Sequence, residues 1–409
     1  MNAYDYDTMV QFVHEEDVKF IRLAFVDVFG VQKNISIMPG ELERAFRDGI
    51  SFDASSIEGF GDEVQSDLFL FPDPKTMSIL PWRPSNGRVA RMYCDIKYPD
   101  GRSFEKDSRL ILKKAIAKAR ERQMMINVGP EIEFYLFKTD DDGNPTKIPF
   151  DEAGYMDIAP EDKGENVRRE ICFNLIDMGI RPETSHHAAG PGQNEVDFRY
   201  SDALTAADNT ETFKWVVKTA AMGNGLHADF SPKPLRNEYG NSMHINISIE
   251  NGKSEEDTYY FMAGIMEHIR EMTLFLNPTY ESYERFGSKK APKYITWSRE
   301  NRSQLIRIPA TKHGNERIEL RSPDPMANPY LVTALLIYAG LDGIEHEMNV
   351  PDAVDVNLRT ADTSVTKNLK TLPLTLSEAI ECAKNSEFIK GILPDTYIET
   401  YSNIGRQLD

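Results

Sequence analysis

Four short segments of this 409-residue sequence alternate charged or polar residues with apolar ones. They are GPEIEFYLF (129–137), QNEVDFRY (193–200), MHINISI (243–249) and RIELR (317–321). Because successive side chains of a strand point to opposite faces, each segment predicts a strand with one polar and one apolar face. The polar positions are Glu131, Glu133, Glu195, Asp197, Arg199, His244, Asn246, Ser248, Arg317, Glu319 and Arg321.

These polar faces suggest a site for divalent cations. Taken alone, each segment is also compatible with a half-exposed strand whose charged face is solvated. Four such segments together favour strands that pack against helices and line one cleft. Carboxylates gathered there repel one another unless cations compensate them. Several glutamates with one histidine suit Mg²⁺ or Mn²⁺, and the set holds no thiolate that would favour structural zinc.

A run of arginines accompanies the acidic strands. Guanidinium groups suit phosphate oxygens and carboxylates, so the run favours a metal–nucleotide phosphate site; a network of structural arginine–carboxylate pairs is the alternative. The sequence contains no GxxxxGK[ST] or GxGxxG motif, so side chains and metals would hold the phosphates. The arginines are Arg299, Arg302, Arg307, Arg317 and Arg321.

The elements that position these residues alternate between strand-like and helix-like segments, which suggests an α/β or α+β architecture. We expect strands at 20–30 and 88–96, and a first long helix that begins with Ser108 as its N-cap. We place a domain boundary near residue 103, which gives domains 1–103 and 104–409. Further helices are expected at 211–221, at 257–275, from Asn328-Pro329 onward and after Thr375.

Composition restricts the class of protein. With 47 basic and 65 acidic residues the formal charge is −18, and 40% of the residues are hydrophobic, as in soluble globular proteins. The acidic balance argues against nucleic-acid binding. Three scattered cysteines form neither a disulfide framework nor a zinc site, and neither a signal peptide nor a membrane span is recognisable. We therefore expect a cytoplasmic protein with no nucleic-acid or membrane partner.

The chain resembles a type I glutamine synthetase. The resemblance runs in order through DASSIEGF (53–60), GPEIEF, SHHAAGPGQNEV, MHINIS, NRSQLIRIPA and RIELRSPDPMANPYL, and so covers nearly the whole chain. It implies an α+β fold: an N-terminal β-grasp domain and a C-terminal catalytic domain with a curved antiparallel half-barrel sheet. It also implies self-association into hexameric rings, single or paired into dodecamers, with each active site between two subunits.

By resemblance, the chemistry is an ATP-dependent ligation in nitrogen metabolism. ATP phosphorylates the γ-carboxylate of glutamate or a related acid, and ammonia or another amine displaces the phosphate, with Mg²⁺ or Mn²⁺ as cofactor and ATP as co-substrate. Glu131, His244 and Glu319 resemble ligands of the ion that serves ATP, and Glu133 and Glu195 two ligands of a second ion. Arg302, Arg307 and Arg317 resemble the residues that bind the phosphates, and Gly240, Arg285 and Arg321 those that hold the acid. Phe60 and Ser248 lie at positions that contact adenine, and Asp53 resembles the group that recruits ammonium.

Two of these assignments have simpler alternatives. Phe60 could serve only in interface packing, and Asp53 could cap a turn or a helix.

The first departure from the family pattern is at the second ion. The pattern has a glutamate after the two histidines of SHHAAGPGQNEV, whereas this chain has Ala188. The spacing to Glu195 is intact, so the change is a substitution. It removes a negative ligand and weakens the site unless Asp197, His187 or the substrate compensates.

The second departure is in the flap, where FGSKKAP places Lys290 at the position of a glutamate that takes a proton from the incoming ammonium. A lysine cannot serve as an anionic site and would repel a cationic amine. Tyr239 also replaces a substrate-contacting asparagine. The position of a tyrosine that is adenylylated in some relatives is Arg359, so that control is not expected.

Two readings of function follow. The first is a ligase that uses ammonia or a non-standard acid or amine, and the second is a catalytically impaired paralogue with a regulatory or binding role. Because the chain ends at NIGRQLD, short of the tail that joins two rings in the family, we expect a single or weakly paired ring.

Overall fold

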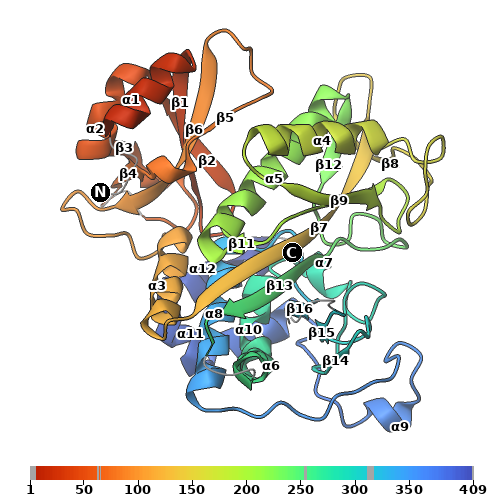
Figure 1. Ribbon diagram of the computed structural model, residues 1–409. Helices are drawn as coiled ribbons and strands as arrows, with labels where there is room; N and C mark the ends of the chain where they lie inside the picture. Colours follow the sequence, from red (N-terminus) through yellow and green to blue (C-terminus); the bar gives the residue numbers. More distant parts are fainter. Residues whose placement is uncertain (1–5, 62–63, 65, 253–255, 311–316, 408–409) are drawn as a thin grey trace.

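The computed structural model describes residues 6–61, 64, 66–252, 256–310 and 317–407, which form an α+β fold (Figure 1). The N-terminal part carries a six-stranded sheet in the order β2-β1-β6-β4-β3, with β5 also paired to β6. The central pair β1 and β6 is parallel, whereas the other pairs are antiparallel. The strands are β1 (Val18–Val26), β2 (Gln32–Ile37), β3 (Ile50–Asp53), β4 (Asp67–Pro72), β5 (Ser78–Ile79) and β6 (Arg88–Lys97).

The second sheet has ten strands, and its longest strand, β7 (Met125–Thr139), crosses the centre of the molecule (Figure 1). The main path is β14-β15-β16-β13-β7-β10-β9, and β8, β11 and β12 also pair with β7. The other strands are β8 (Pro145–Pro149), β9 (Pro182–His187), β10 (Gln193–Phe198), β11 (Ser201–Asp202), β12 (Leu226–Asp229), β13 (Met243–Glu250), β14 (Trp297–Arg299), β15 (Ile306–Ile308) and β16 (Ile318–Leu320). All four strands predicted from alternation are therefore present.

The register of this sheet brings the predicted polar faces together. His244 lies opposite Glu131 across the β13–β7 pair, and Glu195 lies opposite Glu133 across the β10–β7 pair. Glu319 enters from β16, on the other side of β13. Because residues directly opposite each other in antiparallel strands point to the same face, these side chains share one side of the sheet.

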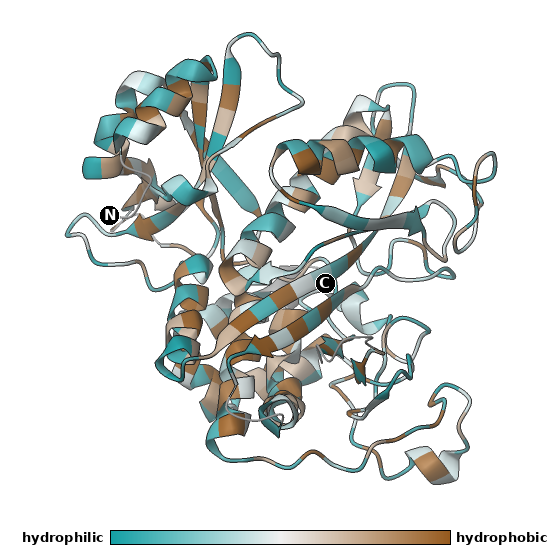
Figure 2. Cartoon of the chain, in the orientation of Figure 1, coloured by the Kyte–Doolittle hydropathy of each residue, from teal (hydrophilic) through white to brown (hydrophobic). Residues whose placement is uncertain are grey.

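The opposite face of the sheet is apolar and packs against helices. Phe134 of β7 and Phe198 of β10 both contact Phe213 of helix α5 (Ala203–Gly223), with ring centroids 6.2 and 5.6 Å apart. Figure 2 shows the resulting alternation of hydrophobic and hydrophilic residues along β7 and β13. The other helices of eight or more residues are α1 (Tyr6–Glu15), α3 (Ser108–Glu121), α4 (Glu165–Asp177), α6 (Glu256–Leu276), α8 (Pro329–Glu345), α10 (Leu376–Lys384) and α12 (Asp395–Gln407).

The N-cap residues of three helices were predicted, and two of them are confirmed. Asn328 caps α8 by accepting from the N–H groups of Tyr330 and Leu331, and Thr375 caps α10, both as predicted. The prediction for α3 was wrong by one residue: Asp107, not Ser108, caps it. Asp and Ser are both favourable N-cap residues, so the sequence alone does not show which of the two begins the helix.

The part of the chain that the structure describes also contains four short α-helices. They are α2 (Leu42–Arg47), α7 (Tyr280–Tyr283), α9 (Thr363–Thr366) and α11 (Glu387–Ile392). Among the described residues, none of the helices has the length and apolar character needed to cross a bilayer. The predicted boundary near residue 103 falls between β6 and α3, and contacts such as Tyr401 Oη donating to the Val28 carbonyl at 2.9 Å connect the two parts.

Candidate active site

Glu131, His244 and Glu319 form a compact group on the polar face of the second sheet. One ligand atom from each lies within 4.8 Å of the others, and His244 Nδ1 is 3.6 Å from both Glu131 Oε2 and Glu319 Oε1. Glu319 is fully buried and His244 nearly so. Two carboxylates and one imidazole at this spacing fit a divalent cation such as Mg²⁺ or Mn²⁺.

Neighbouring positive and hydrogen-bonding groups hold both carboxylates of this group ionised. Burial would raise the pKa of Glu131, but the contacts with His244 and Asn246 outweigh it and lower that pKa. For Glu319, burial likewise raises the pKa, and the positive charge of Arg321 outweighs it. Both carboxylates are thus ionised at neutral pH, as metal ligands must be.

Arginines surround the same group. Glu319 accepts from Arg307 through one oxygen and from Arg321 through the other, the latter at 2.5 Å. Arg317 donates to Asn246 Oδ1 at 2.9 Å, and Asn246 donates to Glu131 Oε1 at 2.9 Å. Pairs between arginines and carboxylates therefore exist, so the structural alternative is realised in part.

Two buried donors of these arginines are unpaired within the part of the chain that the structure describes. The Nε atoms of Arg307 and Arg321 are buried and have no hydrogen-bond partner among the described residues. Arg302 is exposed near the start of β15. These donors fit an ion–phosphate assembly, while the individual phosphate and substrate roles stay predictions.

The second pair of carboxylates is occupied by a lysine. Glu133 and Glu195 are buried, and Lys290 Nζ lies 2.9 Å from Glu133 Oε1 and 3.9 Å from Glu195 Oε2. Burial would lower the pKa of Lys290, but the two carboxylates outweigh it and raise that pKa. This arrangement does not fit the predicted second divalent ion, because an ammonium group lies where the ion would be.

The flap that carries Lys290 lies against the first group. His244 Nε2 is 3.2 Å from the Lys290 carbonyl, and Ser242 Oγ donates to the same oxygen at 3.3 Å. Arg359, at the position expected for an adenylylated tyrosine, donates to the Lys289 carbonyl at 2.7 Å. Three side chains from two segments, residues 242–244 and the loop with Arg359, thus hold the backbone of residues 289–290.

Gly240 and Arg285, both predicted to hold the acid, are brought together. A Cβ on Gly240 would lie 2.6 Å from the Pro232 carbonyl and 2.8 Å from Arg285 Cγ, so only glycine fits. Arg285 is 1% exposed, donates to Ser242 Oγ at 2.9 Å and lies 3.6 Å from Asp324. These contacts give Arg285 a structural role, and its contact with substrate stays a prediction.

Of the residues predicted for adenine and ammonium, Phe60 and Asp53 lie in the N-terminal part, whereas Ser248 lies on the strand that carries His244. Phe60 is 3% exposed and packs in the N-terminal core against Phe104, with centroids 5.0 Å apart, which disfavours an adenine contact. Its packing is within the core of the chain, and not the interface packing named as the alternative. Ser248 is half-buried on β13. Asp53 is exposed at the end of β3, where it accepts from Ser55 Oγ at 2.6 Å and from the Ser55 N–H at 2.9 Å, so it does cap a turn.

Sequence reasoning missed a second acidic group, Asp151, Asp162 and His187, whose atoms also lie within 4.8 Å of one another. Its polar atoms are already partnered. Arg168 pairs with Asp162 at 2.5 Å, and His187 Nε2 lies 2.9 Å from Asp151 Oδ1. Both ring nitrogens of His187 have partners, Asp151 Oδ1 and the Ala188 carbonyl, so the suggestion that it compensates for Ala188 was wrong.

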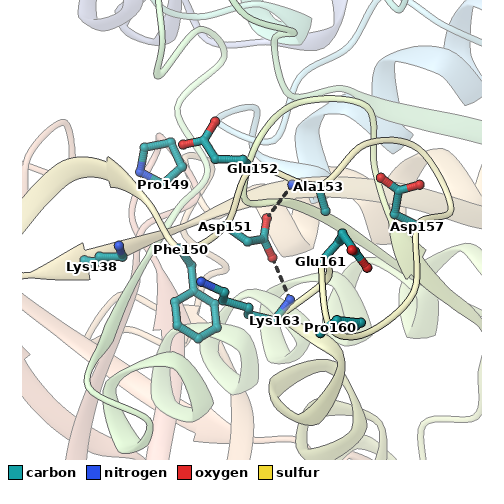
Figure 3. Close-up of a pocket in the computed structure, with 10 residues that line it drawn as sticks. All are labelled: Lys138, Pro149, Phe150, Asp151, Glu152, Ala153, Asp157, Pro160, Glu161 and Lys163. Atoms are coloured by element: carbon teal, nitrogen blue, oxygen red, sulfur yellow. Dashed lines mark hydrogen bonds between the residues drawn. The ribbon is translucent and has the colours of Figure 1, made fainter.

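A cavity of about 300 Å³ lies beside this acidic group (Figure 3). In Figure 3 Asp151 points to the backbone N–H groups of Ala153 and Lys163, which hold the loop between β8 and α4. The carboxylate therefore organises the loop, and we assign no chemistry to the cavity.

Similar proteins match along the whole chain. The family model for the glutamine synthetase catalytic domain matches residues 105–407, and the model for the glutamine synthetase beta-Grasp domain matches residues 17–99. Glutamine synthetases of Clostridium saccharobutylicum and Methanosarcina mazei are each 44% identical to the chain; the alignments cover 98% and 97% of it, and 94% and 92% of those proteins. The predicted α+β fold with an N-terminal β-grasp domain is confirmed.

Solved structures agree with this fold. The structure described as "GmaS/ADP complex-Conformation 1" superposes with a TM-score of 0.88 at 30% identity, over 97% of this chain and 94% of that one. The cryoEM structure of Plasmodium falciparum glutamine synthetase gives a TM-score of 0.86 at 24% identity, over 100% and 96% of the two chains, which shows the fold alone.

Proposed function

Because this chain belongs to the glutamine synthetase family, we propose that it is an ATP-dependent ligase that joins ammonia or another amine to the γ-carboxylate of glutamate or a related acid. The observation that carries the proposal is the group Glu131–His244–Glu319 with arginines beside it. A divalent ion and a triphosphate need this combination of acidic ligands and guanidinium donors. The ADP complex of the similar GmaS structure supports a nucleotide site here.

The chemistry proceeds through an acyl phosphate. An oxygen of the γ-carboxylate attacks the terminal phosphorus of ATP, and ADP leaves. The amine nitrogen then attacks the carbonyl carbon, phosphate leaves with the electron pair of the C–O bond, and the nitrogen loses a proton. The first step is needed because a free carboxylate would have to expel oxide.

Each residue has a part in this scheme. Glu131, His244 and Glu319 would hold one Mg²⁺ or Mn²⁺, which when bound offsets the charge of the phosphates. Arg302, Arg307 and Arg317 bind phosphate oxygens. Glu319 also orients Arg307 and Arg321 through its two oxygens. The remaining contacts to the acid come from Gly240, Arg285 and Arg321, and those to adenine from Ser248.

The proton of the amine needs an acceptor other than the flap. Lys290 is a cation held between carboxylates and cannot accept it. Asp53 is exposed and hydrogen bonds from Ser55 and Ser56 lower its pKa, so it stays anionic and can attract a cationic amine. We assign the recruitment of ammonium, but not the acceptance of its proton, to Asp53 of a neighbouring subunit.

An impaired paralogue is the second candidate, and the observations that favour it are Ala188 and Lys290. Hydroxamate formation from glutamate, hydroxylamine and ATP separates the two. We expect hydroxamate and ADP in equal amounts, dependent on a divalent cation. Nucleotide binding without turnover on any acid or amine of a panel would instead indicate the paralogue.

The same assay identifies which acid and which amine the protein uses. Turnover with ammonia at ordinary concentrations would identify a simple glutamine synthetase, whereas turnover only with another acid or amine would identify a specialised ligase. Phosphate release measured across the panel distinguishes these outcomes.

We also propose a homo-oligomeric ring, and the position of Asp53 supports it. Strand β3, which ends at Asp53, belongs to the N-terminal sheet, apart from the polar face formed by β7, β13 and β16 (Figure 1). Its carboxylate would therefore complete the site of a neighbour. We expect native mass spectrometry to give six times the 46.5 kDa of the chain, or twelve times if two rings pair. A monomer that retains full turnover would contradict this arrangement.

A further inference from the structure

The position of the Lys290 side chain carries an inference beyond the proposed ligase activity. Its ammonium lies 2.9 Å from Glu133 Oε1 and 3.9 Å from Glu195 Oε2, inside the carboxylate pair expected to bind a second divalent ion. We propose that Lys290 is a built-in cation that replaces this ion, so that the chain binds one divalent ion per active site. The remaining ion is held by Glu131, His244 and Glu319.

Charge balance connects Lys290 with the other departure at this place. A divalent ion among three carboxylates leaves a net charge of −1. Because Ala188 stands where the family pattern has the third carboxylate, Glu133 and Glu195 supply −2. One ammonium restores the same net charge of −1. A divalent ion in addition to Lys290 would leave the group positive, and the two cations would repel at close range.

The ammonium is held in place by the backbone as well as by charge. The Lys290 carbonyl is close to His244 Nε2 and accepts from Ser242 Oγ, so the loop is anchored at the residue itself. Ser242 also donates its N–H to Glu133 Oε2 at 2.9 Å, which fixes the carboxylate that faces the ammonium. The Tyr155 ring, 5.7 Å from Nζ, adds a cation–π contact.

His186 also contacts the carboxylate pair of Glu133 and Glu195, at Glu195. Its Nε2 lies 3.5 Å from Glu195 Oε2, and Tyr155 contacts its ring at 5.4 Å between centroids. Glu195 is thus contacted by a lysine and a histidine, and none of the groups of three potential ligands among the described residues includes Glu133 or Glu195. The second site is built for a side-chain cation.

The inference rests on the proposed function only for the expectation of a second ion, and it is tested by binding rather than turnover. Mn²⁺ is titrated without nucleotide into the full-length protein and counted by calorimetry and by metal analysis after dialysis. We expect one Mn²⁺ per chain in the natural protein. Electron paramagnetic resonance should show isolated ions, since two ions within one site would couple magnetically.

Two variants test the role of Lys290 directly. Ala188→Glu alone should still bind one Mn²⁺, because the ammonium remains. Ala188→Glu with Lys290→Met should bind two, because three carboxylates then lack a cation. Two ions in the natural protein or in Ala188→Glu, or only one in the double variant, would overturn the proposal.

Lys289→Met is the matched control, since it removes a neighbouring positive charge that is exposed and contacts Tyr239 instead of the carboxylates. It should bind one Mn²⁺. If the double variant does not fold, anomalous scattering from Mn²⁺ in the natural protein decides: a peak at Glu131–His244–Glu319 alone supports the proposal, and a peak between Glu133 and Glu195 overturns it. A protein that binds one ion but forms no hydroxamate would refute the ligase proposal alone.

Discussion

Replacing Glu319 with glutamine is expected to lower metal-dependent ATP use by about 10³-fold or more. The substitution removes one anionic ligand from the group with Glu131 and His244. A bound ion contributes several kcal/mol of charge stabilisation to phosphoryl transfer, and each tenfold in rate corresponds to about 1.36 kcal/mol. ADP release at saturating Mg²⁺ measures the loss, and titration with Mn²⁺ should show weaker binding.

Glu319 has a second role that the experiment must separate. It pairs with Arg307 and Arg321 in a buried setting, and loss of one partner of such a pair costs about 3–5 kcal/mol of stability. Glu131→Gln removes a ligand of the same group without leaving these arginines unpaired, because Glu131 contacts Asn246 and His244. It should lose metal-dependent turnover with a smaller loss of stability.

Glu183→Gln serves as control, because Glu183 is an exposed residue of β9. It should keep the natural rate. Unchanged ADP release in both Glu131→Gln and Glu319→Gln would contradict the assignment of the ion site.

The polar faces could be predicted from the sequence because the two-residue period of a strand is a property of the backbone. Alternation alone placed Glu131 and Glu133 on one face and Ile132 on the other. The pairing of β7 with β13 and β10 could not be read from alternation, because register depends on contacts between distant segments. The resemblance supplied that information, and the structure places His244 opposite Glu131.

Other features could not be predicted from the sequence, because they depend on how a loop or an aromatic or imidazole side chain packs in the folded protein. Lys290 was expected to repel a cationic amine, yet the fold of the flap turns its ammonium into the carboxylate pair. His187 was considered as a ligand, but it lies on the opposite face from His186 and pairs with Asp151. Phe60 is an apolar residue in a turn. Its burial in the core depends on tertiary packing, which the sequence does not show.

The double variant Ala188→Glu with Lys290→Glu is expected to raise ammonia-dependent turnover by about tenfold or more. It restores a carboxylate beside Glu133 and Glu195, removes the competing ammonium, and supplies an anionic group on the flap. That group can attract ammonium and accept its proton, and general base catalysis typically contributes about 10²–10⁴-fold. Glutamine formed from glutamate, ammonia and ATP is measured at several ammonia concentrations.

The comparison variants show which change matters. Ala188→Glu alone retains Lys290 and should gain little, because the flap still lacks a proton acceptor. Ala188→Glu with Lys289→Glu makes the same change of charge at an exposed neighbour that lies over the Tyr239 ring, and it should also gain little. A gain in this control equal to that of the main variant would mean that overall charge, not the position of the flap group, limits ammonia use. No gain in the main variant would mean that the natural flap is already matched to its own amine, and a search among other amines would then be the more informative experiment.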